Sequence, residues 1–142
     1  MERRHKLIMA AFVAAGLAFF VAAGMIGNSG NSDVSVVNNP AIDALIPNRG
    51  DEVLQQQQVG IDLATDFRLV QLTISPDAKC GSPVDVTNQT RHVEGLQQYV
   101  FSPGEGLPIE RLSADFNCAV ATFEEIARPG DFEQIEWTFT VN

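Results

Sequence analysis

The stretch Ile135-Glu-Trp-Thr-Phe-Thr-Val141 decides the fold. Apolar and polar side chains alternate along it without a break, which puts every second side chain on one face of an extended strand. Such a strand buries one face in a core and exposes the other. The same period of two recurs in two earlier stretches, whose buried faces would carry Val59, Ile61 and Leu63, and Val70, Leu72 and Ile74.

Shorter and less regular strand candidates lie in the rest of the region that begins near residue 40. They cover residues 84–87, 98–101 and 118–126, and Pro, Gly, Ser and Asp cluster in the turns between them. Six to seven short strands with a turn every 8–12 residues or so predict an all-β fold, an antiparallel β-sandwich, with a small barrel as the alternative. The predicted core also contains Phe101, Leu112, Phe116 and Phe123.

The first 27 residues differ in composition from the rest. Residues 1–6 carry three basic side chains and one acidic one, and residues 7–27 carry no charge. At about 1.5 Å per residue this run is about 31 Å long, close to the thickness of a bilayer's hydrocarbon core. Its length favours an uncleaved transmembrane helix over a cleaved signal peptide, whose best cleavage site would be Ala22-Ala23-Gly24. The basic residues before the run predict a cytoplasmic N-terminus and an exported remainder.

These features divide the chain into four parts. Residues 1–6 are predicted to be a cytoplasmic stub and residues 7–27 a transmembrane helix or signal anchor. Residues 28–39, rich in Asn, Ser, Gly and Asp, are predicted to be a flexible linker. Residues 40–142 are predicted to form an extracytoplasmic β-sandwich domain. The protein is therefore expected in the cell membrane as a single-pass protein, and signal peptide cleavage would instead release a secreted β-sandwich.

The charge of the chain excludes one class of partner. The formal net charge is −9, and residues 7–142 carry 6 basic and 17 acidic side chains, which gives −11. Nucleic acid phosphates need clusters of Lys and Arg that this sequence lacks. We therefore expect no nucleic acid partner.

The two cysteines, Cys80 and Cys118, are predicted to form a disulfide. An exported domain lies in an oxidising compartment, and the number of cysteines is even. Closing this 38-residue separation would stabilise the fold by about 4 kcal/mol on the chain-entropy model. Two free thiols are the alternative, and the absence of a C-x-x-C spacing argues against a redox-active pair.

The sequence predicts no catalytic residue, no cofactor and no metal site. His92 lies in a polar segment, where we expect an exposed loop histidine because no framed nucleophile accompanies it. Arg49-Gly50-Asp51 is interpreted as ordinary turn chemistry. Glu124 and Glu125 are adjacent, so on a strand they point to opposite faces and cannot form one acid–base pair.

Three stretches carry a family resemblance. Residues 99–106 read Tyr-Val-Phe-Ser-Pro-Gly-Glu-Gly, and they are followed by Asn117-Cys-Ala-Val-Ala-Thr-Phe123 and by Trp137-Thr-Phe-Thr-Val141. The pattern resembles bacterial immunoglobulin-like domains, and with the N-terminal anchor the chain is similar to small membrane-tethered immunoglobulin-like proteins of actinobacteria, a group without an assigned function. The resemblance covers roughly residues 46–141. It implies an antiparallel immunoglobulin-like β-sandwich and no particular chemistry.

Two better-known relatives fit less well. The stretch Ser113-Ala-Asp-Phe-Asn-Cys118 is similar to the D-x-Y-x-C corner of antibody-type domains, but Phe116 replaces the tyrosine whose hydroxyl makes that corner. Copper-resistance proteins of similar sandwich fold bind metal through histidines, and the predicted exported part contains one histidine, His92. Neither function is therefore carried over.

The sequence favours a non-catalytic, extracytoplasmic binding or interaction module that is tethered to the membrane through residues 7–27. Sandwiches of this kind hold partners with loops and sheet edges. The expected partner is another cell-surface protein or an envelope component, of unknown identity. The alternative is an enzyme or a metal-binding domain whose site cannot be recognised in the sequence.

Overall fold

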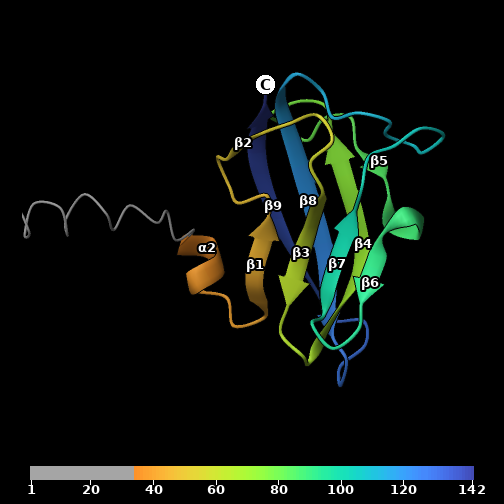
Figure 1. Ribbon diagram of the computed structural model, residues 1–142. Coiled ribbons are helices and arrows are strands. Elements are labelled where there is room, and N and C mark those ends of the chain that lie inside the picture. Colours follow the sequence, from red (N-terminus) through yellow and green to blue (C-terminus); the bar gives the residue numbers. More distant parts are fainter. Residues whose placement is uncertain (1–33) are drawn as a thin grey trace, which may run out of the picture. The chain divides into compact units, whose positions relative to one another are not determined.

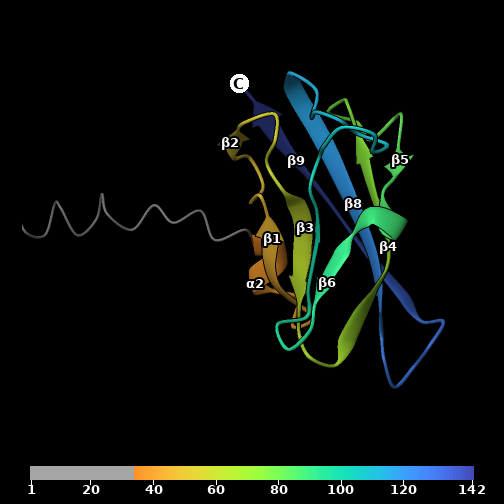
Figure 2. The same cartoon turned by 45° about the vertical axis from the view of Figure 1, so that its right-hand side comes forward.

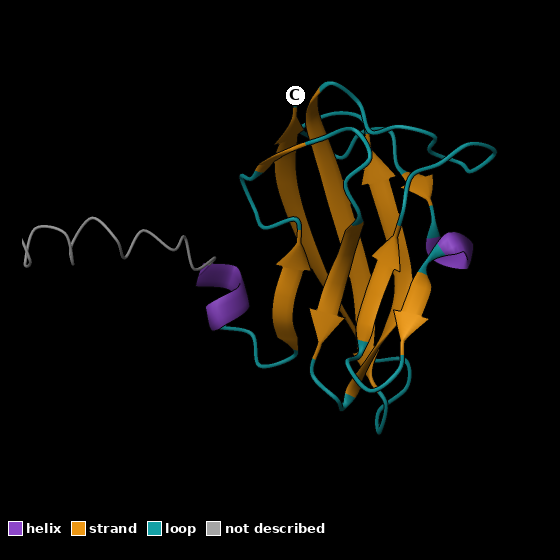
Figure 3. Ribbon diagram, viewed as in Figure 1, coloured by secondary structure: helices purple, strands orange, loops and turns teal. Residues whose placement is uncertain are grey.

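A computed structural model describes residues 34–142, which form two facing β-sheets (Figures 1 and 3). Two short helices, α2 (Val34–Val37) and the 3-10 helix η1 (Thr87–Gln89), accompany the strands. The four-stranded sheet has the order β1 (Ile42–Ile46), β3 (Val59–Leu63), β7 (Gln98–Phe101) and β6 (Arg91–Val93). The five-stranded sheet has the order β2 (Glu52–Val53), β9 (Phe132–Val141), β8 (Asp115–Glu125), β4 (Phe67–Ser75) and β5 (Val84–Asp85).

This arrangement confirms the all-β prediction and selects the sandwich over the barrel, because the two sheets share no strand pairing in the described residues. Neighbouring strands are antiparallel except for β2, which pairs in parallel with β9. The described residues contain nine strands where the sequence predicted six to seven. The sequence missed β1, β2 and β6. In β1 a register shift between Ile42 and Ala44 breaks the alternation that would have marked it.

The core between the sheets contains the alternating residues of β9, as predicted. Trp137 is 0% exposed, and Ile135, Phe139 and Val141 are also buried. They pack with the inward side chains of β3, β4, β7 and β8 and with Leu112 from the loop before β8. Figure 2 shows the two layers from the side, with β1, β3 and β6 in one and β8 and β4 in the other. The sandwich therefore rests on apolar burial between its two sheets.

Val70 does not lie in the core, which corrects the prediction for this strand. Its side chain is 37% exposed. In the pairing of β4 with β8, Leu69 lies opposite Phe123 and Gln71 lies opposite Thr122, so Val70 is the extra residue of a β-bulge. Because of this bulge, Leu69 packs against the core in its place.

Phe116 is the second correction, since its side chain is 52% exposed. The inward positions of β8 are occupied by Asn117, Ala119, Ala121 and Phe123, so Phe116 points to the outer face of the sheet. The sequence pattern misleads here because the first inward position holds a polar residue. The side chain of Asn117 is buried because its amide is hydrogen-bonded to the backbone of Ser113.

The predicted stub (1–6) and transmembrane helix (7–27) lie outside the described residues. Within residues 34–142 there is no helix with the length and apolarity needed to cross a membrane. The end of the predicted linker (28–39) is folded rather than extended. Residues 34–37 form α2, Val36 packs partly against the core, and the Asn39 side chain accepts a hydrogen bond from the Ala41 N–H at 2.9 Å.

Candidate functional site

One end of the sandwich is formed by three long connections, residues 47–58, 76–83 and 102–114, and we call it the loop end. Backbone hydrogen bonds tie the connections 47–58 and 102–114 to each other, and 47–58 to the sheet. The Leu112 N–H donates to Gln55 O at 2.9 Å, and the Gly50 N–H donates to Thr138 O at 2.8 Å. The opposite end holds shorter connections, including the turn between β8 and β9 (Figure 2). The loop end is therefore the more elaborate of the two.

A pocket of about 310 Å³ opens at the loop end, between the connection 76–83 and the segment before β8. This volume is at the lower limit for small-molecule sites. Arg111 also lines a second hollow of about 350 Å³, next to Gln55 and the C-terminal Asn142. The first pocket combines apolar walls with one cation and one anion, from Ile74, Pro76, Val84, Pro108, Ile109, Glu110, Arg111, Ser113 and Asn117.

Two side chains at this pocket also hold the connection 102–114 in place. The Glu110 carboxylate accepts the Gly106 N–H at 3.3 Å, and the Asn117 amide accepts from Ser113 N at 3.1 Å and donates to Ser113 O at 2.7 Å. The Arg111 side chain projects between the two hollows without an ion pair among the described residues.

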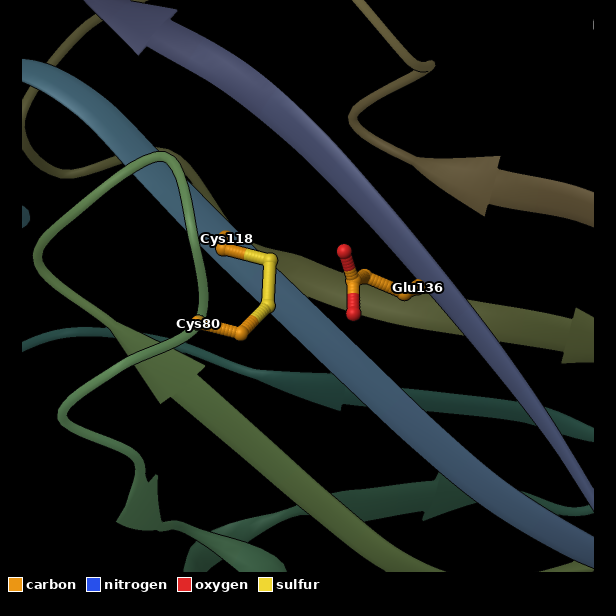
Figure 4. Close-up of side chains that lie close together, drawn as sticks. All are labelled: Cys80, Cys118 and Glu136. Carbon is orange, nitrogen blue, oxygen red and sulfur yellow. A yellow bond between two sulfur atoms is a disulfide. The ribbon is translucent and has the colours of Figure 1, made fainter.

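The predicted disulfide between Cys80 and Cys118 is confirmed, with the two Cα atoms 5.2 Å apart. It does not lie between the sheets. Cys118 alternates on β8 with the inward Ala119 and Ala121, so it points to the outer face of the five-stranded sheet. There it meets Cys80 from the connection 76–83, which crosses over β8 (Figure 4). The bond therefore attaches one connection of the loop end to the face of the sheet.

The residues around Cys80 have a conformation of their own. Cys80 has a positive φ of 52°. The Asp77 carboxylate accepts the Lys79 N–H at 2.7 Å and the Gly81 N–H at 3.0 Å, which fixes the chain on both sides of Cys80. The Gly81 N–H, followed by the Lys79 N–H, lowers the pKa of Asp77 below its ordinary value. This turn is the local reason why Cys80 faces the sheet.

Glu136 is the third side chain at the disulfide, and the sequence analysis did not identify it. It lies opposite Val120 on the outer face of β9, two residues along the strands from the Cys118–Thr138 pair. A carboxylate oxygen of Glu136 and the two sulfur atoms all lie within 4.8 Å of one another. In Figure 4 its carboxylate points toward the disulfide. Only the strand register could have revealed this, because Glu136 and Cys118 are 18 residues apart.

His92 lies on strand β6, which corrects the prediction of a loop histidine, although its side chain is exposed as expected. Its ring stacks on Tyr99 with centroids 4.3 Å apart, and its Nε2 lies 2.6 Å from Gln97 Oε1. The Gln97 amide nitrogen donates to backbone oxygens of Thr65 and Phe67, so Oε1 is the acceptor and His92 Nε2 carries the proton. The ring is thereby held by an amide and an aromatic face.

The remaining acidic candidates have structural partners. Glu124 and Glu125 point to opposite faces, as predicted. Glu124 pairs with Arg68 at 2.6 Å and accepts the Gly130 N–H at 2.7 Å, whereas Glu125 pairs with Arg128. The Gly130 N–H first, and then Arg68, lower the pKa of Glu124. These carboxylates hold strand ends and turns together.

The tripeptide Arg49-Gly50-Asp51 forms a turn against β9, as interpreted from the sequence. The Asp51 carboxylate accepts the Asn48 N–H at 3.0 Å, and the Asp51 backbone oxygen accepts the Thr140 N–H at 2.8 Å. Asp51 is thus bonded to neighbouring backbone through both its carboxylate and its backbone oxygen. Its carboxylate and its backbone have roles within the fold.

No family model matches this sequence, and no curated protein matches it. Among solved structures, the described fold is similar to that of PcoC, a methionine-rich copper resistance protein from Escherichia coli. The sequences are 17% identical, the likeness covers 73% of this chain and 99% of that one, and the TM-score is 0.50. The selenomethionine form of PcoC gives 15% identity, coverage of 72% and 100%, and a TM-score of 0.49. This likeness shows the fold alone.

Proposed function

We propose that residues 34–142 are an immunoglobulin-like, non-catalytic binding module that acts outside the cytoplasm. The strand order β1-β3-β7-β6 of the four-stranded sheet corresponds to the A-B-E-D sheet of immunoglobulin domains. When β2 is left out, the order β9-β8-β4-β5 of the other sheet corresponds to G-F-C-C′. This correspondence supports the immunoglobulin-like fold, whereas the proposed relation to small membrane-tethered immunoglobulin-like proteins of actinobacteria rests on the sequence resemblance.

The location outside the cytoplasm is supported by the disulfide. Structural disulfides form and persist in oxidising compartments, and Cys80 and Cys118 are bonded. The basic residues 1–6 and the uncharged run 7–27 are the sequence features of a single membrane anchor with a cytoplasmic N-terminus. We propose that this anchor holds the domain at the outer surface of the membrane.

The observation that carries the binding function is the pocket at the loop end. It lies between two connections that are fixed to the sheet, by the Asn117 amide on one side and by the Cys80–Cys118 bond on the other. A site that is held in place before a partner arrives loses less conformational freedom on binding. We propose that a cell-surface protein or an envelope component binds here, with Arg111 facing one of its acidic groups.

We do not extend copper binding to this chain. PcoC is described as a methionine-rich copper resistance protein, and thioether sulfur is a ligand that selects copper(I). Residues 34–142 contain no methionine and one histidine, His92. Methionine, the residue type named in that description, is absent from the sequence of this domain.

Site-specific cross-linking in living cells tests the proposal. A photoreactive amino acid replaces either Glu110 at the loop end or, as the matched control, Glu94 in the β6–β7 turn at the opposite end; both positions are exposed. We expect one discrete adduct from position 110, accessible to protease added outside intact cells, and none from position 94. Arg111→Glu should weaken that adduct. Equal adducts from both positions, or an adduct protected inside the cell, would contradict the proposal.

A further inference from the structure

The outer face of the five-stranded sheet brings together two sulfurs and one carboxylate. Cys118 on β8 and Glu136 on β9 come from paired strands, and Cys80 comes from the connection that crosses over β8 (Figure 4). Their ligand atoms lie within 4.8 Å of one another. Cys118 is buried, Cys80 is half-buried and Glu136 is exposed. The cluster is therefore open to solvent on the carboxylate side.

We propose that, when the Cys80–Cys118 disulfide is reduced, these three residues bind one Zn²⁺ ion. The two thiolates and the Glu136 carboxylate supply three ligands, and a water molecule takes the fourth position of a tetrahedron. This site goes beyond the binding function at the loop end and does not depend on it.

The ligand atoms are close to the spacing that zinc needs. With Zn–S bonds of about 2.3 Å and Zn–O bonds of about 2.0 Å at tetrahedral angles, the ligand atoms lie about 3.5–3.8 Å apart. The two sulfurs must therefore move apart once their bond is broken, and the carboxylate needs to approach by only about 1 Å. Rotation of the two cysteine side chains about their Cα–Cβ bonds and the exposed Glu136 side chain allow both movements.

The local conformation of the chain around Cys80 does not rest on the disulfide alone. Asp77 accepts hydrogen bonds from Lys79 and Gly81, on either side of Cys80, at 2.7 and 3.0 Å. Cys118 is fixed by its place in the middle of the five-stranded sheet, where it pairs with Ser75 and Thr138. Reduction therefore leaves the turn around Cys80 and the strand position of Cys118 intact, and Zn²⁺ would join the two in place of the disulfide.

The set of ligands selects the ion. Thiolate sulfur favours zinc and copper(I), whereas carboxylate oxygen suits magnesium, calcium and manganese. A site with two thiolates and one carboxylate fits Zn²⁺, which takes both kinds of ligand. The carboxylate beside two thiolates also concentrates negative charge that a divalent cation neutralises.

A small thiol, R–SH, can serve as the reductant of the disulfide. Two R–SH molecules break the Cys80–Cys118 bond, become one R–S–S–R, and leave two protein thiols. Binding of Zn²⁺ then releases the two thiol protons, so the affinity for zinc should fall as the pH is lowered. Oxidation by R–S–S–R, which is reduced to two thiols, reverses the sequence, with loss of the zinc ion and formation of the disulfide.

The test compares the full-length protein in its two redox states under anaerobic conditions. The protein is reduced with a phosphine, desalted, and titrated with Co²⁺ and then with Zn²⁺ against a chromophoric chelator. We expect the reduced protein to show the thiolate-to-cobalt charge-transfer band and the visible bands of tetrahedral Co²⁺, which stoichiometric Zn²⁺ abolishes. The oxidised protein should show neither. Absence of these bands from the reduced protein would overturn the proposal.

Two variants separate this site from a pair of thiols that binds metal without the carboxylate. Glu136→Gln should weaken zinc binding by the reduced protein at least about tenfold, as expected for loss of a group at a metal centre. Glu133→Gln removes the same charge from the same strand and should leave the affinity unchanged. Equal affinities for wild type and Glu136→Gln would refute the site, and so would Trp137 emission showing that the reduced, zinc-loaded protein is unfolded.

Discussion

Gly60 should not tolerate even a methyl group. It lies on β3 opposite Val100 of β7, in the middle of the four-stranded sheet. A Cβ atom built on Gly60 would lie 2.0 Å from the backbone oxygen of Tyr99 and 2.8 Å from Val100 Cα. These are backbone atoms of the neighbouring strand, so rotation of a side chain cannot relieve the overlap. In Gly60→Ala the two strands must therefore move apart.

The cost of this substitution can be estimated from the pairing it disturbs. Relieving the contact requires a shift of more than about 1 Å between strands that lie about 4.8 Å apart. Such a shift weakens the hydrogen bonds nearest Gly60, each worth about 1 kcal/mol net, and overpacking adds about 1–3 kcal/mol. We expect Gly60→Ala to lower the free energy of unfolding by about 3 kcal/mol or more. For a domain of this size that is a fall in melting temperature of about 12 °C or more.

Urea and thermal unfolding followed by the emission of Trp137 would measure this loss. Gly104→Ala is the matched control, because a Cβ atom there meets only the Leu107 side chain, at an ordinary 3.6 Å. The control should stay within about 0.5 kcal/mol of wild type. A melting temperature of Gly60→Ala equal to that of the control would show that β3 and β7 do not approach as closely as described.

Four further predictions concern other parts of the chain. Trp137→Ala should cost about 3–5 kcal/mol in urea unfolding, and the phenylalanine variant clearly less, because the indole N–H is buried without a partner among the described residues. Cys118→Ser should lower the melting temperature and leave one thiol that can be alkylated, whereas two such thiols in the native exported protein would contradict the bond. Glu124→Gln should be less stable than wild type near pH 7, because the Gly130 N–H and a guanidinium lower the pKa of the Glu124 carboxyl in the folded protein. The difference in stability should disappear as the pH falls through that pKa, and a difference independent of pH would contradict this. Full-length protein should stay in the membrane fraction through a carbonate wash with Met1 retained, and a mature N-terminus inside or after the apolar run would refute the anchor.

The sequence predicted the strands whose alternation is unbroken. In β3 and over residues 135–141 of β9 every inward residue is apolar, so the period of two identifies the buried face directly. It failed at Val70 because a bulge adds one residue to β4, and it failed at Phe116 because Asn117 occupies the inward position on β8. In both cases the partner strand, rather than the local sequence, determines which face is buried.

The candidate site was less accessible to sequence analysis than the fold. The cysteine pair could be predicted by counting, because an even number of cysteines in an exported domain favours a disulfide. Neither the pocket nor Glu136 could be predicted, because each depends on segments that only the strand register brings together. Arg111 has no distinguishing local motif, and its position between the two hollows follows from the path of residues 102–114.

The place of the disulfide connects the stability of the fold with the proposed site. The bond lies on the outer face of the sheet, whereas the core around Trp137 and Phe123 is closed by apolar packing between the sheets. Its loss should therefore act first on the connection 76–83, which carries both Cys80 and Pro76. Pro76 lines the pocket at the loop end. The redox state of the bond thus sets the position of one pocket wall, so reduction of the disulfide should alter cross-linking from position 110 before it unfolds the domain.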